Sequence, residues 1–132
     1  MAFIPNNTNY VWLTPNGAGQ APMTKRLTDA CPFDLVVVNL LPAGALAATC
    51  GTPAIDQGSI TLGTPIVSAA ASLYPDGSTG PAGAVLQIEL SGGALPAGIA
   101  SLQCTLSIPF TDTEGQTRTA CAVINLTNQV SP

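Results

Sequence analysis

The hydrophobic residues in the second half of the chain recur at every other position. In the stretch VLQIELS, Leu86, Ile88 and Leu90 fall on one side of an extended backbone, and Gln87 and Glu89 fall on the other. A period of two is the pattern of a β-strand that buries one face. The stretch LQCTLSI repeats this pattern, so both segments are predicted to point an apolar face at the same interior.

Six extended segments are predicted in all, separated by turns. Twelve prolines and thirteen glycines are spread along the chain and leave no room for a long helix. One short helical turn is expected, around Ala45–Thr49. The spacing of the extended segments is typical of an all-β sandwich. They are FDLVVVNLL (33–41), SITLG (59–63), PIVSAAASLY (65–74), AVLQIELSG (84–92), SLQCTLSIPF (101–110) and TRTACAVINL (117–126).

The last of these segments has apolar residues on both sides, so it is predicted to be covered on both faces. On one side are Cys121 and Val123, and on the other are Ala120, Ala122, Ile124 and Leu126.

Two Gly-containing turns, PDGS (75–78) and TEGQ (113–116), place glycine where a positive φ is needed. A hairpin closed on TEGQ would place Cys121 opposite Ile108. The triplet Gly-Thr-Pro occurs at 51–53 and again at 63–65. A repeat unit would be longer, so we interpret this recurrence as coincidence.

The first 28 residues differ in kind from the rest. Phe3, Tyr10 and Trp12 are half of the six aromatic residues, and the segment is interrupted by prolines, which favour a fixed extended backbone. We therefore predict an extended arm at 1–28, whose aromatics fill pockets on a partner, and a sandwich domain at 29–132. Alternatively, YVWL (10–13) is the first strand of the sandwich, and Trp12 fills part of its hydrophobic core. Both interpretations can hold together.

The low content of charged residues limits the kinds of partner that the protein can bind. Only 8% of the residues are charged, the formal net charge is −4, and the only cations are Lys25, Arg26 and Arg118. Nucleic-acid backbones require clustered lysine and arginine, so direct nucleic-acid binding is not expected. No apolar stretch reaches the roughly 20 residues of a membrane span, and the N-terminus does not resemble a secretory signal. We expect synthesis in the cytoplasm and no membrane partner.

The residues needed for catalysis are scarce. The chain has no histidine, and Asp112 and Glu114 are the only closely spaced pair among its seven acids. They flank a hairpin loop that should be exposed, where their pKa values have no reason to shift. No catalytic, cofactor-binding or metal-binding residue is therefore predicted, and the protein is not expected to be an enzyme.

The four cysteines admit two interpretations. No C-x-x-C pair is present, so four buried thiols in a reducing compartment are expected. The alternative is one disulfide within each half of the chain. The predicted hairpin register places Cys121 opposite Ile108, and this argues against a bridge between Cys104 and Cys121. The candidate pairs are Cys31 with Cys50 and Cys104 with Cys121.

Three consecutive stretches in residues 84–126 follow one pattern: IELSGG at a strand end, then AGIASLQCTLSI, and then the hairpin DTEGQTRTACAVINL. Together they resemble the small immunoglobulin-like domains of tailed-bacteriophage structural proteins, notably the fibre–tail adaptor type. The resemblance implies an immunoglobulin-like antiparallel β-sandwich that carries the N-terminal arm.

It also implies a non-enzymatic virion protein, present in several copies and docked on other tail, fibre or capsid subunits. A capsid decoration protein is the alternative within this class. A carbohydrate-binding or adhesive module is the alternative from another class.

Overall fold

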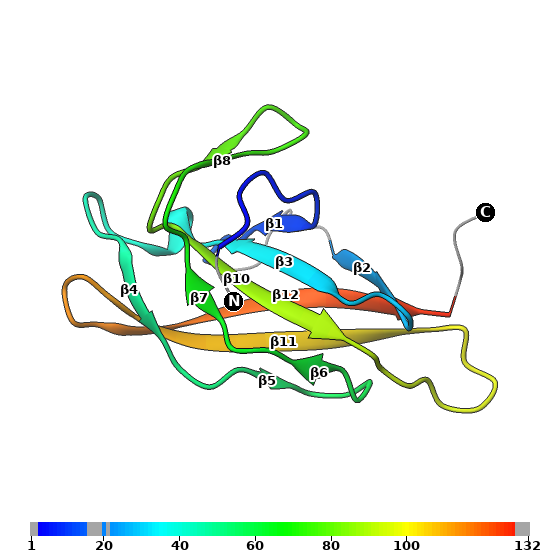
Figure 1. The fold of residues 1–132 in the computed structure, drawn as a ribbon. Coiled ribbons are helices and arrows are strands. Elements are labelled where there is room, and N and C mark those ends of the chain that lie inside the picture. The colour runs from blue at the N-terminus through cyan, green and yellow to red at the C-terminus, as the bar shows by residue number, and fades with distance from the viewer. Residues whose placement is uncertain (1–2, 16–19, 21, 129–132) are drawn as a thin grey trace.

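A computed structural model describes residues 3–15, 20 and 22–128, which form two β-sheets and a small hairpin (Figure 1). Sheet A has the strand order β1-β3-β10-β6, and β7 also pairs with β10. Sheet B has the strand order β2-β12-β11-β4, and β5 also pairs with β11. Sheet A comprises β1 (Tyr10–Trp12), β3 (Cys31–Val36), β6 (Thr61–Leu62), β7 (Ile66–Val67) and β10 (Val85–Ser91). Sheet B comprises β2 (Met23–Arg26), β4 (Ala47–Cys50), β5 (Ala54–Ile55), β11 (Ser101–Asp112) and β12 (Thr117–Thr127). The separate hairpin is β8 (Ser72–Leu73) with β9 (Thr79–Gly80).

The predicted all-β class is confirmed, but the sheets are not purely antiparallel. Strand β1 runs parallel to β3, and β2 runs parallel to β12, while the remaining pairs are antiparallel. The N-terminal segment thus adds one parallel edge strand to each sheet. The immunoglobulin-like label stays a prediction.

The alternation in the second half of the chain places the core as expected. The inward side chains of β10 and β11 belong to one hydrophobic cluster between the sheets. Strand β12 contributes Ala120, Ala122, Ile124 and Leu126, all with at most 1% of their surface exposed. The prediction that this last strand is covered on both faces is wrong, because Cys121 is exposed and Val123 is only half-buried.

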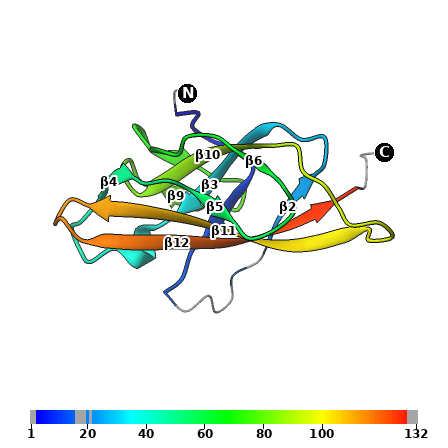
Figure 2. The ribbon, with the colours of Figure 1, turned by 90° about the horizontal axis from the view of Figure 1, so that it is seen from below.

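The β11–β12 hairpin is one residue out of the predicted register. Cys121 lies opposite Ser107, and Cys104 lies opposite Ile124. The backbone N–H of Asp112 donates to the carbonyl of Gln116 at 2.9 Å, so the turn closes one residue earlier than TEGQ suggests. Figure 2 shows the resulting long hairpin running the length of the molecule.

The short helical turn expected at Ala45–Thr49 is also wrong. Residues Ala47–Cys50 form strand β4, and a single 3-10 turn lies earlier, at Val38–Leu40. Strand β4 is held by pairing with β11, which is a long-range contact that local sequence does not reveal. No helix among the described residues is long and apolar enough to cross a membrane.

The two Gly-Thr-Pro triplets occupy equivalent places. One separates β4 from β5 at the edge of sheet B, the other separates β6 from β7 at the edge of sheet A, and together they line a notch of about 460 Å³. The backbone N–H of Gly51 donates to Pro109 O at 2.7 Å, and that of Gly63 donates to Glu89 O at 2.8 Å. A Cβ on either glycine would lie 3.0–3.1 Å from the neighbouring strand. Proline and a break at a sheet edge block further strand addition, so the recurrence has a structural role.

The segment expected as an arm lies against the sandwich wherever the structure describes it. Residues 10–12 and 23–26 are β1 and β2, so this segment contributes a strand to each sheet. The interpretation of YVWL as the first strand is confirmed, although Val11 and Leu13 enter the main core and Trp12 does not. Residues 1–2, 16–19 and 21 of the predicted arm, and 129–132 of the predicted domain, lie outside the described residues.

Candidate functional site

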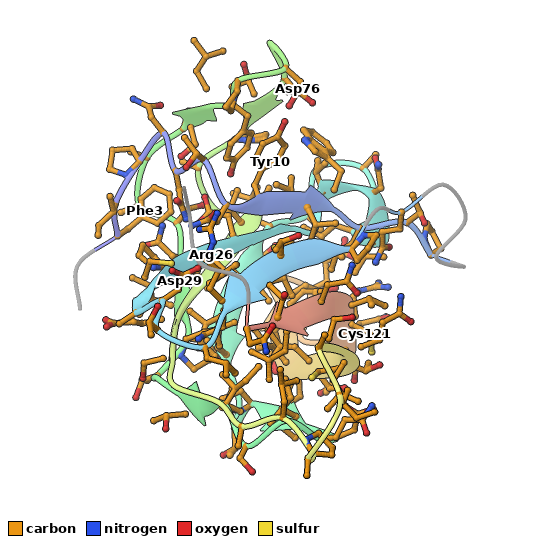
Figure 3. The ribbon with its side chains drawn as sticks, turned by 90° about the vertical axis from the view of Figure 1, so that its right-hand side faces the viewer. Phe3, Tyr10, Arg26, Asp29, Asp76 and Cys121 are labelled. Atoms are coloured by element: carbon orange, nitrogen blue, oxygen red, sulfur yellow. The ribbon has the colours of Figure 1, made fainter. Side chains whose placement is uncertain are left out.

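The three predicted anchors lie on the outer face of sheet A. Phe3, Tyr10 and Trp12 are half-buried and pack against a small cluster centred on Tyr74, beneath the β8–β9 hairpin. The rings of Tyr10 and Tyr74 are stacked, with centroids 4.2 Å apart, and the Trp12 indole N–H donates to Ser78 Oγ at 3.0 Å. Figure 3 shows Tyr10 below the hairpin that carries Asp76. The aromatics therefore contact their own domain, and their role as anchors on a partner stays a prediction.

A buried carboxylate lies at the centre of this outer layer. Asp34 on β3 is completely buried. The Gln87 side-chain amide donates to its Oδ1 at 2.8 Å, and the Asn7 amide donates to the same oxygen at 3.1 Å. The Tyr74 hydroxyl donates to Oδ2 at 3.0 Å. Three neutral donors from three separate segments thus converge on one acidic group.

The same network fixes the N-terminal segment to the sheet. The Ile4 N–H donates to Gln87 Oε1 at 2.9 Å, and Gln87 Nε2 donates to Ile4 O at 2.8 Å. Asn6 exchanges bonds with the β8–β9 hairpin, where its N–H donates to Ser72 Oγ and its Oδ1 accepts from the Leu73 N–H. Residues 4–7 are thus held against sheet A and the β8–β9 hairpin by hydrogen bonds that involve side chains, and not by the backbone pairing of a strand.

Burial raises the pKa of Asp34, and the bonds from Gln87, Asn7 and Tyr74 oppose that rise. Burial, together with the nearby Asp34 carboxylate, also raises the pKa of Tyr74. In the part of the chain that the structure describes, no cation pairs with Asp34. The completely buried Asp34 therefore links β3, β10, the N-terminal segment and the β8–β9 hairpin through hydrogen bonds.

Sequence reasoning missed this network. A lone acid inside the apolar run CPFDLVVV and a lone amide inside VLQIEL were the available signals, because a polar residue within such a run requires a partner when buried. Asp34 and Gln87 are directly opposite each other in the β3–β10 pair. Their pairing could be recognised only once the register of those two strands was known.

Asp112 also differs from the expectation of an exposed, unshifted acid. Its side chain is buried at the base of the β11–β12 hairpin, where Oδ1 accepts from the backbone N–H groups of Glu114 and Gln116, both at 2.9 Å. Arg118 Nε donates to Oδ2 at 2.9 Å. The Arg118 bond and these N–H groups lower the pKa of Asp112. Asp112 and Glu114 are therefore a turn motif, and the structure does not bring them together as a catalytic pair.

This geometry predicts an acid-sensitive hairpin. Because the folded-state pKa of Asp112 lies below its unfolded value, its contribution to stability is present above the unfolded pKa and is lost as the pH falls through the folded one. We expect Asp112→Asn to lower the thermal unfolding midpoint by several degrees at neutral pH and by much less in strong acid. Thermal melts followed by circular dichroism between these conditions measure the difference. An equal loss at every pH would contradict the assignment.

All three cations are engaged within the molecule. Lys25 is completely buried, and its Nζ donates to Arg26 O at 2.8 Å and to Gly92 O at 2.6 Å. Burial lowers the pKa of Lys25. Arg118 is paired with Asp112, and Arg26 lies 3.8 Å from Asp29. The cations are thus dispersed and form no basic patch.

The outer face of sheet B presents a row of mostly polar side chains from the two long strands β11 and β12. We define the hairpin face as the outward side chains of β11 and β12, with Thr24, Thr49 and Ala54 beside them. Two charged residues border the face: Arg26 on β2 lies opposite Thr127, and the exposed Asp56 follows β5 and accepts a hydrogen bond from the Thr105 backbone N–H at 2.8 Å. None of the members defined above is charged. The outward members of the two long strands are Ser101, Gln103, Thr105, Ser107, Pro109, Thr111, Thr117, Thr119, Cys121, Val123, Asn125 and Thr127.

The four cysteines are free thiols, so neither alternative disulfide is formed. Only Cys104 is buried, and Cys121 is exposed on the hairpin face, which corrects the expectation of four buried thiols. No group of three or more acidic, histidine or cysteine side chains that could hold a metal occurs among the described residues. Comparison with protein-family models, with curated proteins and with solved structures found no match.

Proposed function

We propose that the chain is a non-enzymatic structural subunit of a tailed-bacteriophage virion, a fibre–tail adaptor or similar tail or neck component that docks onto neighbouring subunits. The phage assignment is based on the resemblance of residues 84–126, which form β10, β11 and β12 and supply central strands to both sheets. Its activity is to present a rigid surface, and its partners are other virion proteins.

The observation that carries the structural role is the uncharged hairpin face. Charged surfaces must lose tightly bound water when they are covered, whereas hydroxyl and amide groups exchange one set of hydrogen bonds for another at little net cost. A broad, regular surface of this kind suits repeated contacts in an assembly, where many weak interfaces act together.

The carbohydrate-binding alternative has less support. Such modules stack sugar rings on exposed aromatic side chains, and none of the six aromatics here is exposed: Phe33, Tyr74 and Phe110 are buried, and the other three are half-buried. We therefore retain only the virion classes.

Quantitative mass spectrometry of gradient-purified phage particles from a culture that produces this chain tests the proposal. We expect the chain to remain with the particles after washing. Tens of copies per particle would favour the adaptor, and hundreds would favour the decoration protein. Particles that lack the chain would contradict both.

Deletion of residues 1–28 is a poor test of docking, because it would also remove β1 and β2 from the sheets.

A further inference from the structure

We propose that the hairpin face is the interface of a two-fold symmetric homodimer, in which two copies pack sheet B against sheet B. The proposal concerns the isolated chain and does not depend on the phage assignment.

The first support is charge. Each copy carries a formal net charge of −4, so two copies repel unless they meet through neutral surfaces. All twelve outward positions of β11 and β12 are uncharged. A face-to-face dimer covers this uncharged surface and leaves the exposed Asp76, Glu89 and Glu114, which are not members of the face, in solvent.

The second support is the distribution of polarity within the face. Its middle holds small apolar side chains among hydroxyls: Val123 lies opposite Thr105, and Cys121 lies opposite Ser107. Ala54 lies beside Ser107 on the edge strand β5. Its two ends are polar, with Gln103 and Asn125 at one and threonines at the other. An apolar centre with a polar rim is the usual anatomy of a protein interface.

The third support explains why the partner is another copy. Serine and threonine hydroxyls, and the amides of Gln103 and Asn125, each both donate and accept hydrogen bonds. A surface built from such groups is complementary to itself, whereas a surface of carboxylates would require a basic partner. Isologous two-fold contacts need this self-complementarity.

The size of the face is also adequate. β11 and β12 have 12 and 11 residues, but β2, β4 and β5 have only 4, 4 and 2. Strand geometry therefore gives roughly 550 Å² per copy, so that the total of about 1,100 Å² lies just above the roughly 1,000 Å² expected of a biological interface. Edge-to-edge association is disfavoured at the opposite side of the sandwich, because Gly51–Pro53 and Gly63–Pro65 interrupt both edges there. These interruptions do not affect the broad face of sheet B, which stays available to a second copy.

Sedimentation velocity of the purified chain over a wide concentration range, with reductant, provides the test. We expect a species of twice the 13.2 kDa chain mass to grow with concentration. Thr119→Arg adds a charge at an exposed position on the face and should weaken association about tenfold or more, because the two-fold axis doubles the added charge. Ala70→Arg adds the same charge at an exposed position between β7 and β8 and should leave association unchanged.

A second readout uses the exposed Cys121, which lies near the middle of the face. A short thiol-specific cross-linker should trap a covalent dimer of the wild-type chain through Cys121, and Cys121→Ser should prevent this trapping. A chain that stays monomeric at high concentration would overturn the proposal. So would a Thr119→Arg variant that dimerises like the wild type, or a cross-link that persists in Cys121→Ser. Absence of the chain from phage particles would not affect any of these results.

Discussion

Substitution of Asp34 by alanine should lower the free energy of unfolding by about 3 kcal/mol, because it deprives buried donors of their acceptor. The Tyr74 hydroxyl would lose the acceptor to which it donates at 3.0 Å, and Asn7 and Gln87 would each lose one of their bonds. Residues 4–9 and the β8–β9 hairpin would lose their common attachment. Urea denaturation followed by fluorescence of Trp12, which lies in this layer, measures both global stability and local release.

Asparagine at the same position is the matched control. Its carbonyl oxygen can accept from Gln87 and Asn7, and its amide can donate to the Tyr74 oxygen, so every group keeps a partner. Asp34→Asn should therefore be at least as stable as the wild type at neutral pH, because asparagine is neutral like the protonated acid. If alanine and asparagine destabilised the protein equally, the hydrogen-bond account of this layer would be wrong.

The wild-type chain should also respond to pH through Asp34 with a sign opposite to that of Asp112. The folded-state pKa of Asp34 is raised. Its contribution to stability is thus fully present below the unfolded pKa and is lost as the pH rises through the folded one. Asp34→Asn should remove this component and leave the acid-sensitive component of Asp112. Melting curves of both asparagine variants across the acidic range separate the two.

The second large effect is expected at Gly58, in the turn that links β5 to β6. Gly58 has a φ of +87°, and a Cβ there would lie 2.8 Å from Cys104 Sγ and 3.0 Å from a methyl of Leu126. Alanine would combine an unfavourable left-handed backbone with overpacking of the core, so Gly58→Ala should cost about 3 kcal/mol.

Gly44→Ala isolates the backbone part of this cost. Gly44 has a nearly equal φ of +82°, but a Cβ there would meet nothing within 4 Å. We expect a loss of about 1 kcal/mol for this variant. Chemical denaturation of the two variants beside the wild type gives both numbers. Equal losses would show that the space around Gly58 does not matter.

The variants at Asp34 and at Thr119 bear on function because the first tests what stabilises the fold and the second tests the surface proposed to bind a second copy. The outer layer on sheet A uses its polar groups internally, through Asp34, Gln87 and the N-terminal segment. The hairpin face on sheet B presents hydroxyls outward, although Ser107 Oγ lies 3.7 Å from Cys121 Sγ and Thr127 Oγ1 donates to Ala100 O. Changes at Asp34 should therefore alter stability more than association, and changes at Thr119 should do the reverse.

The sequence by itself determined the all-β class and the inner faces of the long strands. Period-two alternation is a local property, because successive side chains of any strand point to opposite faces whatever it pairs with. That is why Leu86, Ile88 and Leu90 could be assigned to the core in advance. The scarcity of helix-compatible windows and the low content of charged residues were equally readable from the sequence alone.

Only the tertiary structure decided which outward residues are covered, since that depends on partners distant in the chain. Gln87 and Cys121 both point away from the core, yet Gln87 is buried under residues 4–7 and Cys121 is exposed. The register of the hairpin became known only from the bonds between Asp112 and Gln116, and the role of the two Gly-Thr-Pro triplets only from the edges at which they lie. Strand pairing and layer contacts are long-range interactions, and a pattern of neighbouring residues does not encode them.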